Sequence, residues 1–238
     1  MQPIVISGSP SIPANTIVDN VIAQDPSLRR YLRSPFLASG SLTAVISATG
    51  VRVSMDYGSK NVVDNSDLRV ATFFDMEFDT IARQWFPNEG DQLVLRAANT
   101  TGAPVTLQYR IVLTPIDISQ LAPDRRVVQR IATILAGAVD TVVYDGSRYE
   151  RPPVDCILDV LATASAAGLT QQVYVEMDSI APAQTVRPAN RVPQVPQDIM
   201  IEDVEVPQDK LIQVLVSNPT GGNLTYFGRL ELPELIRT

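Results

Sequence analysis

The sequence repeats itself, and no other feature constrains its fold as strongly. The clearest match joins DQLVLRAANTTGAPVTLQYRIVLTP, which begins at Asp91, to DKLIQVLVSNPTGGNLTYFGRLELPE, which begins at Asp209. With one inserted residue, the register pairs Asp91 with Asp209, Leu93 with Leu211, Asn99 with Asn218, Gly102 with Gly221, Thr106 with Thr225, Arg110 with Arg229 and Leu113 with Leu232. Each segment alternates apolar and polar residues around an Asn-x-Thr-Gly turn, in which Asn and Gly tolerate positive φ. We therefore predict one β-hairpin in each segment.

Three further pairs of matching segments lie upstream of the hairpins, and they occur in the same order in both halves of the chain. They pair RYLRSP (30–35) with RYERPP (148–153), VRVSMD (51–56) with VYVEMD (173–178), and IVDNVI (17–22) with AVDTVV (138–143). Matches in one order and at nearly constant separation indicate an internal duplication. We expect an N-terminal arm (1–14), a first β unit (15–116), a connector (117–135) and a second β unit (136–238).

The composition favours strands in both units. Val, Ile, Leu and Ala supply the apolar residues, and 18 Pro and 12 Gly interrupt them. About six to eight short strands in about 100 residues is the strand density of a β-sandwich, jelly roll or small barrel. The expected fold is all-β: a tandem duplication of two jelly-roll-like β-sandwiches with a short connecting helix.

The connector carries the sequence signals of a helix. An Ala-Pro-Asp start signal (122–124) precedes apolar residues at helical spacing, and we expect this helix to end near Gly137. The spaced residues are Val127, Ile131, Ile134 and Leu135. For the Ala-rich segments 155–167 and 41–49, helix and strand are both open. The proline-rich stretch 181–198 cannot be a central strand, because proline lacks a backbone donor, and we expect a long surface loop there.

The residue types argue against an enzyme. The chain contains no histidine, which removes the commonest general base and the commonest zinc ligand. It has no glycine-rich phosphate motif, and its single cysteine, Cys156, lies in an apolar run. Asp75, Glu77 and Asp79 alternate along FFDMEFD, but an amphipathic strand with a wet face explains them better than a calcium site or a glycosidase pair. We expect no catalytic residue, cofactor or metal.

Charge and hydropathy restrict the partners and the compartment. The net charge is −7, so specific nucleic-acid binding is not expected. The N-terminus lacks the features of a secretion signal, and no apolar run reaches the length of about 20 residues that a membrane helix needs. A lone cysteine excludes an intrachain disulfide. We expect synthesis in the cytoplasm.

The Arg-Tyr-x-Arg-x-Pro element is the most distinctive polar motif, since it occurs in both copies. An anion site is one interpretation, but a catalytic site rarely needs to be present twice. We favour a structural role, in which the arginines pair with acids at an intrasubunit or intersubunit contact. The candidate anchor and interface residues, including the paired hairpin arginines, are Arg30, Tyr31, Arg33, Arg148, Tyr149, Arg151, Arg110 and Arg229.

Two tandem β-sandwich units joined by a short connector resemble the double jelly-roll major capsid proteins of tailless icosahedral viruses and phages. The Asn-Thr-Thr-Gly hairpin and its VTLQYRIVL strand are similar in style to phage structural proteins. The resemblance implies trimers whose six β units form a pseudo-hexagonal tile of an icosahedral shell. It also implies location in the virion and self-association, contacts with other virion proteins, and in some cases an underlying internal membrane. The proline-rich loop and both termini would make the contacts.

Two other functions stay open. The chain can be a virion spike protein, or a non-catalytic tandem β-sandwich that binds carbohydrate or protein. A carbohydrate module requires an aromatic groove, and its tyrosines would have to converge. These are Tyr57, Tyr109, Tyr149, Tyr174 and Tyr226.

Overall fold

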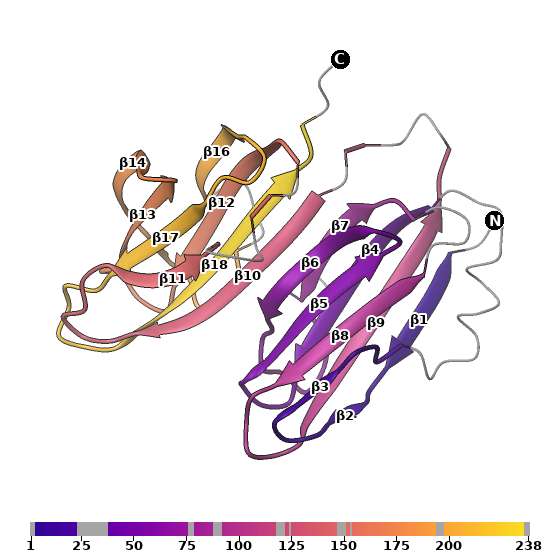
Figure 1. Ribbon diagram of the computed structural model, residues 1–238. Coiled ribbons are helices and arrows are strands. Elements are labelled where there is room, and N and C mark those ends of the chain that lie inside the picture. The colour runs from indigo at the N-terminus through magenta and orange to yellow at the C-terminus, as the bar shows by residue number, and fades with distance from the viewer. Residues whose placement is uncertain are drawn as a thin grey trace. The chain divides into compact units, whose positions relative to one another are not determined.

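The computed structural model describes residues 3–22, 38–75, 79–87, 92–117, 122–123, 125–146, 151–152, 154–193 and 198–235. All the regular structure in these ranges is β-strand, as predicted, and no α-helix occurs in them (Figure 1). Accordingly, no helix of the described residues is long and apolar enough to span a membrane. The chain separates into two compact units, Met1–Val128 and Gln129–Thr238.

One sheet of the first unit joins segments from its beginning, middle and end. The order is β1 (Ile4–Gly8), β9 (Val105–Pro115), β4 (Ala38–Ile46) and β7 (Thr80–Trp85), with β2 (Ser11–Ile12) also on β9. All these pairs are antiparallel. Because β1 and β2 follow each other along the same edge of β9, they fill one strand position. The segment expected to be an arm therefore contributes the first strand of this sheet.

The second sheet of the first unit is ordered β3 (Thr16–Val18), β8 (Leu93–Asn99), β5 (Val51–Tyr57) and β6 (Lys60–Asp67). Its pairs are also antiparallel. We number the strands of this unit along the chain and count β1 and β2 as one strand. The first sheet then has the order first, eighth, third, sixth. The second sheet has the order second, seventh, fourth, fifth.

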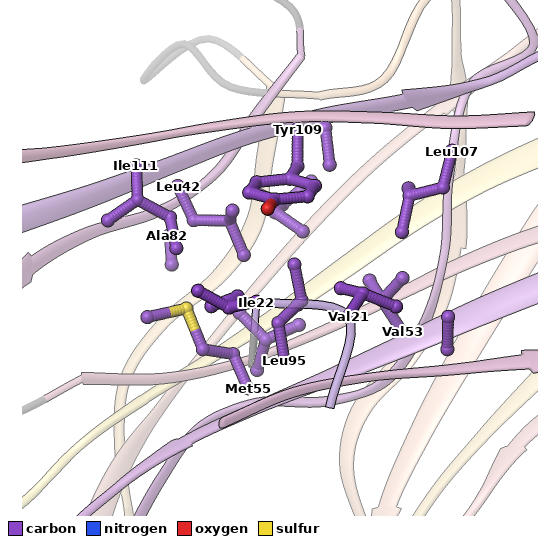
Figure 2. Close-up of a cluster of buried hydrophobic side chains, with 14 of the residues drawn as sticks. Val21, Ile22, Leu42, Val53, Met55, Ala82, Leu95, Leu107, Tyr109 and Ile111 are labelled. Atoms are coloured by element: carbon purple, nitrogen blue, oxygen red, sulfur yellow. The ribbon is translucent and has the colours of Figure 1, made fainter. Parts of the chain in front are cut away.

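The core of the first unit lies where side chains of these two sheets meet. Figure 2 shows Leu42, Leu107 and Tyr109 of one sheet above Met55 and Leu95 of the other. Every second residue of β8 is buried because successive side chains of a strand point to opposite faces. The Trp85 and Tyr57 rings add a tilted contact, with centroids 5.6 Å apart. The alternation seen in the sequence thus produces a two-layer apolar core.

The second unit contains a sheet of the same order. It runs β10 (Arg125–Ile134), β18 (Leu224–Pro233), β12 (Cys156–Ala164) and β16 (Ile199–Val206), with a short β15 (Arg187–Pro188) also on β12. The first residues of β10 belong to the first unit, and the strand continues into the second. With β10 as the first strand and the two-residue β15 left out of the count, this order is again first, eighth, third, sixth.

Its other sheet is ordered β11 (Thr141–Asp145), β17 (Ile212–Ser217), β13 (Thr170–Val175) and β14 (Asp178–Thr185). These are the second, seventh, fourth and fifth strands of the unit. The pairs are antiparallel. The Ala-rich segments left open above are strands β4 and β12, and both have the burial pattern of a strand covered on both faces at its end.

The prediction of a connecting helix is wrong, because the segment forms β10. Val127, Val128, Gln129 and Arg130 are all buried, so both faces of the strand are covered there. A strand buried on both faces loses its alternation, and its apolar residues then fit helical spacing equally well. Val and Ile, which favour strands, were the better indicators.

The structure also corrects the match of VRVSMD with VYVEMD. Met55 pairs with Leu95 in the first unit, and Val173 pairs with Val214 in the second. Val173 is therefore the equivalent of Met55, whereas Met177 lies in the turn before β14 and is 92% exposed. The proline-rich stretch also differs from expectation, since its first residues belong to β14 and β15. β14 is an edge strand, where a proline is tolerated.

Candidate functional site

The two predicted hairpins are built around a buried asparagine each. Asn99, 2% exposed, donates from Nδ2 to the carbonyl oxygens of Ile12, Pro13 and Ala103 at 3.0, 3.0 and 2.9 Å. Its Oδ1 accepts from the backbone and hydroxyl of Thr101, at 2.9 and 2.7 Å. One side chain thus closes the turn and ties it to the first strand of the unit.

Asn218 repeats this arrangement in the second unit. It is fully buried and donates to the carbonyl oxygens of Ile134 and Gly222, at 3.0 and 2.9 Å. Its Oδ1 accepts from the backbone and hydroxyl of Thr220, at 3.1 and 2.7 Å. The pairing of Asn99 with Asn218 was predicted from the sequence, but their shared contact with the first strand was not. Sequence spacing carries no signal for a bond between residues so far apart.

A glycine lies against each of these turns. Gly50 has a φ of +95° and Gly168 a φ of +127°, and a Cβ at either would lie 2.3 Å from the methyl carbon of Thr101 or Thr220. A side chain is therefore excluded at both positions by conformation and by space. The same turn, with the same neighbour, occurs at equivalent places in the two units.

Each unit also contains a buried aspartate directly before its sixth strand. Asp79 accepts from Arg69, with Nε to Oδ1 at 2.6 Å and a terminal nitrogen to Oδ2 at 2.8 Å. Its Oδ2 also accepts from the backbone N–H of Asp75 at 2.5 Å. The hydrogen bond to Asp79 is the largest cause of a raised pKa at Arg69. In the second unit, Arg191 and Asp198 form the corresponding pair at 2.9 Å.

These ion pairs change the interpretation of the acidic row. Asp79 points into the protein, where its side chain is 0% exposed, and closes a turn with Asp75 rather than lining a wet strand face. Glu77 lies outside the described residues. Among the residues that the structure does describe, no group of three or more metal-ligating side chains occurs. The sequence offered no signal for the Arg69–Asp79 or Arg191–Asp198 pairs.

Most of the Arg-Tyr-x-Arg-x-Pro element lies outside the described residues, namely Arg30, Tyr31, Arg33, Arg148 and Tyr149. Arg151 is described: it donates to the carbonyl oxygen of Asp209 at 2.9 Å, and the N–H of Asp209 donates to Pro152. This part of the element therefore fixes a turn within the second unit. Its role in contacts between copies stays a prediction.

The hairpin arginines occupy equivalent strands but different surroundings. Arg110 of β9 is half-buried and lies opposite Ser7 and Thr43 in the neighbouring strands. Arg229 of β18 is 4% exposed and forms an ion pair with Glu231 at 2.7 Å. The structure does not bring the described candidates together in one cluster.

The candidate tyrosines that the structure describes do not converge on a groove. Tyr57, Tyr109 and Tyr226 are buried in the cores, and Tyr149 lies outside the described residues. Burial raises the pKa of Tyr226, whose hydroxyl donates to Gln171. Only Tyr174 lies on an outer sheet face, on β13. Cys156 is buried, as expected of an inert thiol.

The sheet β3-β8-β5-β6 of the first unit and the sheet β11-β17-β13-β14 of the second unit have equivalent strands. The outer faces of these two sheets differ in charge. On the first unit, Arg52 of β5 pairs with Asp67 of β6 at 2.8 Å, and Arg96 of β8 pairs with Asp56 of β5. At the equivalent positions, the second unit has Thr170, Thr185, Leu215 and Tyr174. The outward residues of β13 and β17 carry no charge, whereas those of β5 and β8 include Arg52, Asp56 and Arg96, which form ion pairs. Each face is a candidate surface for a different contact.

Comparison with known proteins gives distant similarity. No family model and no curated protein matches the chain. Among solved structures, the chain resembles that of the infectious bursal disease virus Gx strain, with 12% identity and a TM-score of 0.28 over 98% of this chain and 72% of that one. The VP2 subviral particle of infectious bursal disease virus gives 10% identity and 0.27, with the same coverage. A vicilin from Solanum melongena gives 7% and 0.22, over 95% of this chain and 74% of that one.

Proposed function

We propose that this chain is a structural virion protein: a double jelly-roll capsid subunit that assembles as a trimer with a pseudo-hexagonal outline. The observation that carries the proposal is the strand order. The orders first, eighth, third, sixth and second, seventh, fourth, fifth match those of the B-I-D-G and C-H-E-F sheets of a jelly roll, and this match supports the proposal. Both orders occur in each unit, so the same eight-strand arrangement is present twice in one chain.

The equivalent buried contacts support a duplication. Asn99 and Asn218 make equivalent bonds to the first strand and to the turn, although Asn99 also donates to Pro13. Gly50 and Gly168 lie against the methyl groups of the equivalent residues Thr101 and Thr220. Three copies of such a chain supply six similar units, which is the count that a hexagonal tile requires. The shell formed from these tiles would be icosahedral, and the protein would reside in the virion.

The duplicated elements are structural rather than chemical. Three features recur between the units, and each holds strands together. They are the buried asparagine of the hairpin (Asn99 or Asn218, called the hub asparagine below), the glycine beside the turn, and the buried ion pair. A duplicated building block creates pseudo-symmetry, which favours assembly over doubling of a reactive site.

Size-exclusion chromatography with light scattering tests the proposal. The expected mass is about three times the chain mass of 25.9 kDa, or a shell built from such trimers. A stable monomer at all concentrations would contradict it, and glycan binding by that monomer would favour the binding module instead.

A further inference from the structure

The edge of β6 is covered by the beginning of β10. Val127 forms a parallel bridge with Val63 of β6, on the edge that does not face β5. Next to it, the guanidinium of Arg126 donates to the carboxylate of Asp64. Val127 is 0% exposed. The backbone groups of this edge therefore have a strand beside them.

In the described part of the chain, the equivalent edge of β14 has no such neighbour. β14 pairs with β13 in the register in which β6 pairs with β5: Val175 lies opposite Asp178 as Tyr57 lies opposite Lys60. On this register, Ala181 is the equivalent of Val63. Within the described residues, no strand pairs with the other edge of β14. Apart from Pro182, which has no N–H, the residues of an open edge such as this one present backbone N–H and C=O groups that a further strand can satisfy.

In the first unit, the strand equivalent to β10 is β1, near the beginning of the sequence. Ile12 and Ile134 accept the same bond from the hub asparagines, and this offset makes Val5 of β1 the equivalent of Val127. The register is continuous from β2 back into β1 along β9. Val5 is 49% exposed, whereas Val127 is buried. The first unit thus exposes the side chain that the same strand position buries in β10.

The ion pair at the β6 edge has no counterpart at β1 and β14: both of its charges are absent there. Arg126 and Asp64 form an ion pair beside the β6 edge. Their equivalents are Ile4 and Pro182, so neither charge recurs. A charge kept on one side alone would be buried without a partner when the strands met, which is strongly unfavourable. With neither charge present, the two surfaces can contact each other without burying an unpaired charge.

We propose that β1 of a second copy of this chain lies along the open edge of β14, with Val5 of one copy beside Ala181 of the next. The contact repeats the one that Val127 makes with Val63. It joins different surfaces of the two copies and is therefore heterologous, so it generates a ring when the rotation closes. The inference rests on the proposed function, which sets the ring at three copies.

Cysteine cross-linking tests this contact directly. Val5→Cys with Ala181→Cys, treated with a short bismaleimide, is expected to give covalent dimers and trimers on denaturing gels. The native thiol is buried and can stay in place. Each single variant should remain at chain mass, because one cysteine per copy cannot bridge this contact. The matched control is Ile17→Cys with Ala181→Cys, since Ile17 is 68% exposed on the other sheet of the first unit.

A second variant measures the strength of the contact. Val5→Asp is expected to weaken association by about tenfold or more, because a charge would be buried between the strands. Ile17→Asp should leave association unchanged. If the chain is a trimer but Val5 and Ala181 cross-link no better than the control pair, the contact is wrong and the proposed function stands. If the chain is a monomer throughout, the proposed function fails and the contact fails with it.

Discussion

The sheets β3-β8-β5-β6 and β11-β17-β13-β14 have equivalent strand registers, but their outer faces carry very different side chains. Arg96 and Ser54 form a cross-strand pair on the first unit, and Leu215 and Gln172 form the equivalent pair on the second. The hubs beneath these faces, at Asn99 and Asn218, are nearly identical. The two units thus share their buried polar contacts and differ in their outer faces, and we infer that the buried contacts hold the fold while the outer face can diverge.

The largest expected effect comes from the buried aspartates. Asp79→Ala and Asp198→Ala should each lower the free energy of unfolding by about 3–5 kcal/mol, because each removes the charge-assisted hydrogen bonds that a buried carboxylate accepts. Urea unfolding followed by circular dichroism measures the loss. Asp19→Ala, at an exposed position, is the control and should change stability by less than about 0.5 kcal/mol. A small effect at one aspartate only would break the equivalence of the two units.

The hub asparagines come next. Asn99→Ala and Asn218→Ala should each cost about 3 kcal/mol, since several buried backbone groups lose a partner at once. The control is Asn223→Ala, whose exposed side chain accepts one bond from Ala136, and it should cost about 1 kcal/mol or less. Similar losses at both hubs support the comparison. Tolerance of either alanine would mean that the hub is not what holds that hairpin.

Much of this fold follows from the sequence. Alternating apolar residues and an Asn-x-Thr-Gly turn predicted both hairpins, and the match of Asn99 to Asn218 located the two hubs in advance. The connecting helix was predicted wrongly, because β10 is buried on both faces and so has no alternation. The Arg69–Asp79 pair could not be found, since tertiary proximity alone brings its partners together.

The candidate contact residues were only partly predictable. The sequence predicted that the termini and the proline-rich stretch would contact other copies. It did not predict which residues would make the contacts. The equivalence of β1 with β10, and of β6 with β14, required strand registers. The two units share little sequence similarity at these strands, so the sequence alone could not align them.

Tyr226 allows a smaller difference between the units to be measured by pH. Its equivalent in the first unit is Leu107, so only the second unit carries a buried phenol here. Burial raises its pKa above the ordinary value of 10.0, so the folded state keeps the neutral phenol where the unfolded state ionises. The stability from this group is present below pH 10.0 and is lost as the pH rises further.

Tyr226→Phe should therefore cost about 1 kcal/mol near neutral pH, from the lost bond to Gln171, and less above pH 10.0. Urea unfolding at a series of pH values gives the difference between wild type and variant. A difference that is constant into the alkaline range would show that Tyr226 does not titrate on unfolding as expected. Tyr174→Phe, on the outer face, serves as the control.

The smallest effect is expected on the charged face itself. Arg96→Leu places the residue of the second unit on the first, and should change stability by less than about 1 kcal/mol, because exposed ion pairs contribute little. The reverse exchange, Leu215→Arg, should be equally mild in the isolated chain. A loss of more than about 2 kcal/mol in either variant would show that the face supports the fold and is not free to diverge.

The central claim is that two jelly rolls in one chain build a three-membered, six-lobed particle. Electron microscopy of the purified protein, with class averages viewed down the symmetry axis, tests it most directly. We predict three-fold particles with six lobes at nearly equal spacing around the axis. Two-lobed single chains, or rings in which the number of lobes is not six, would contradict it.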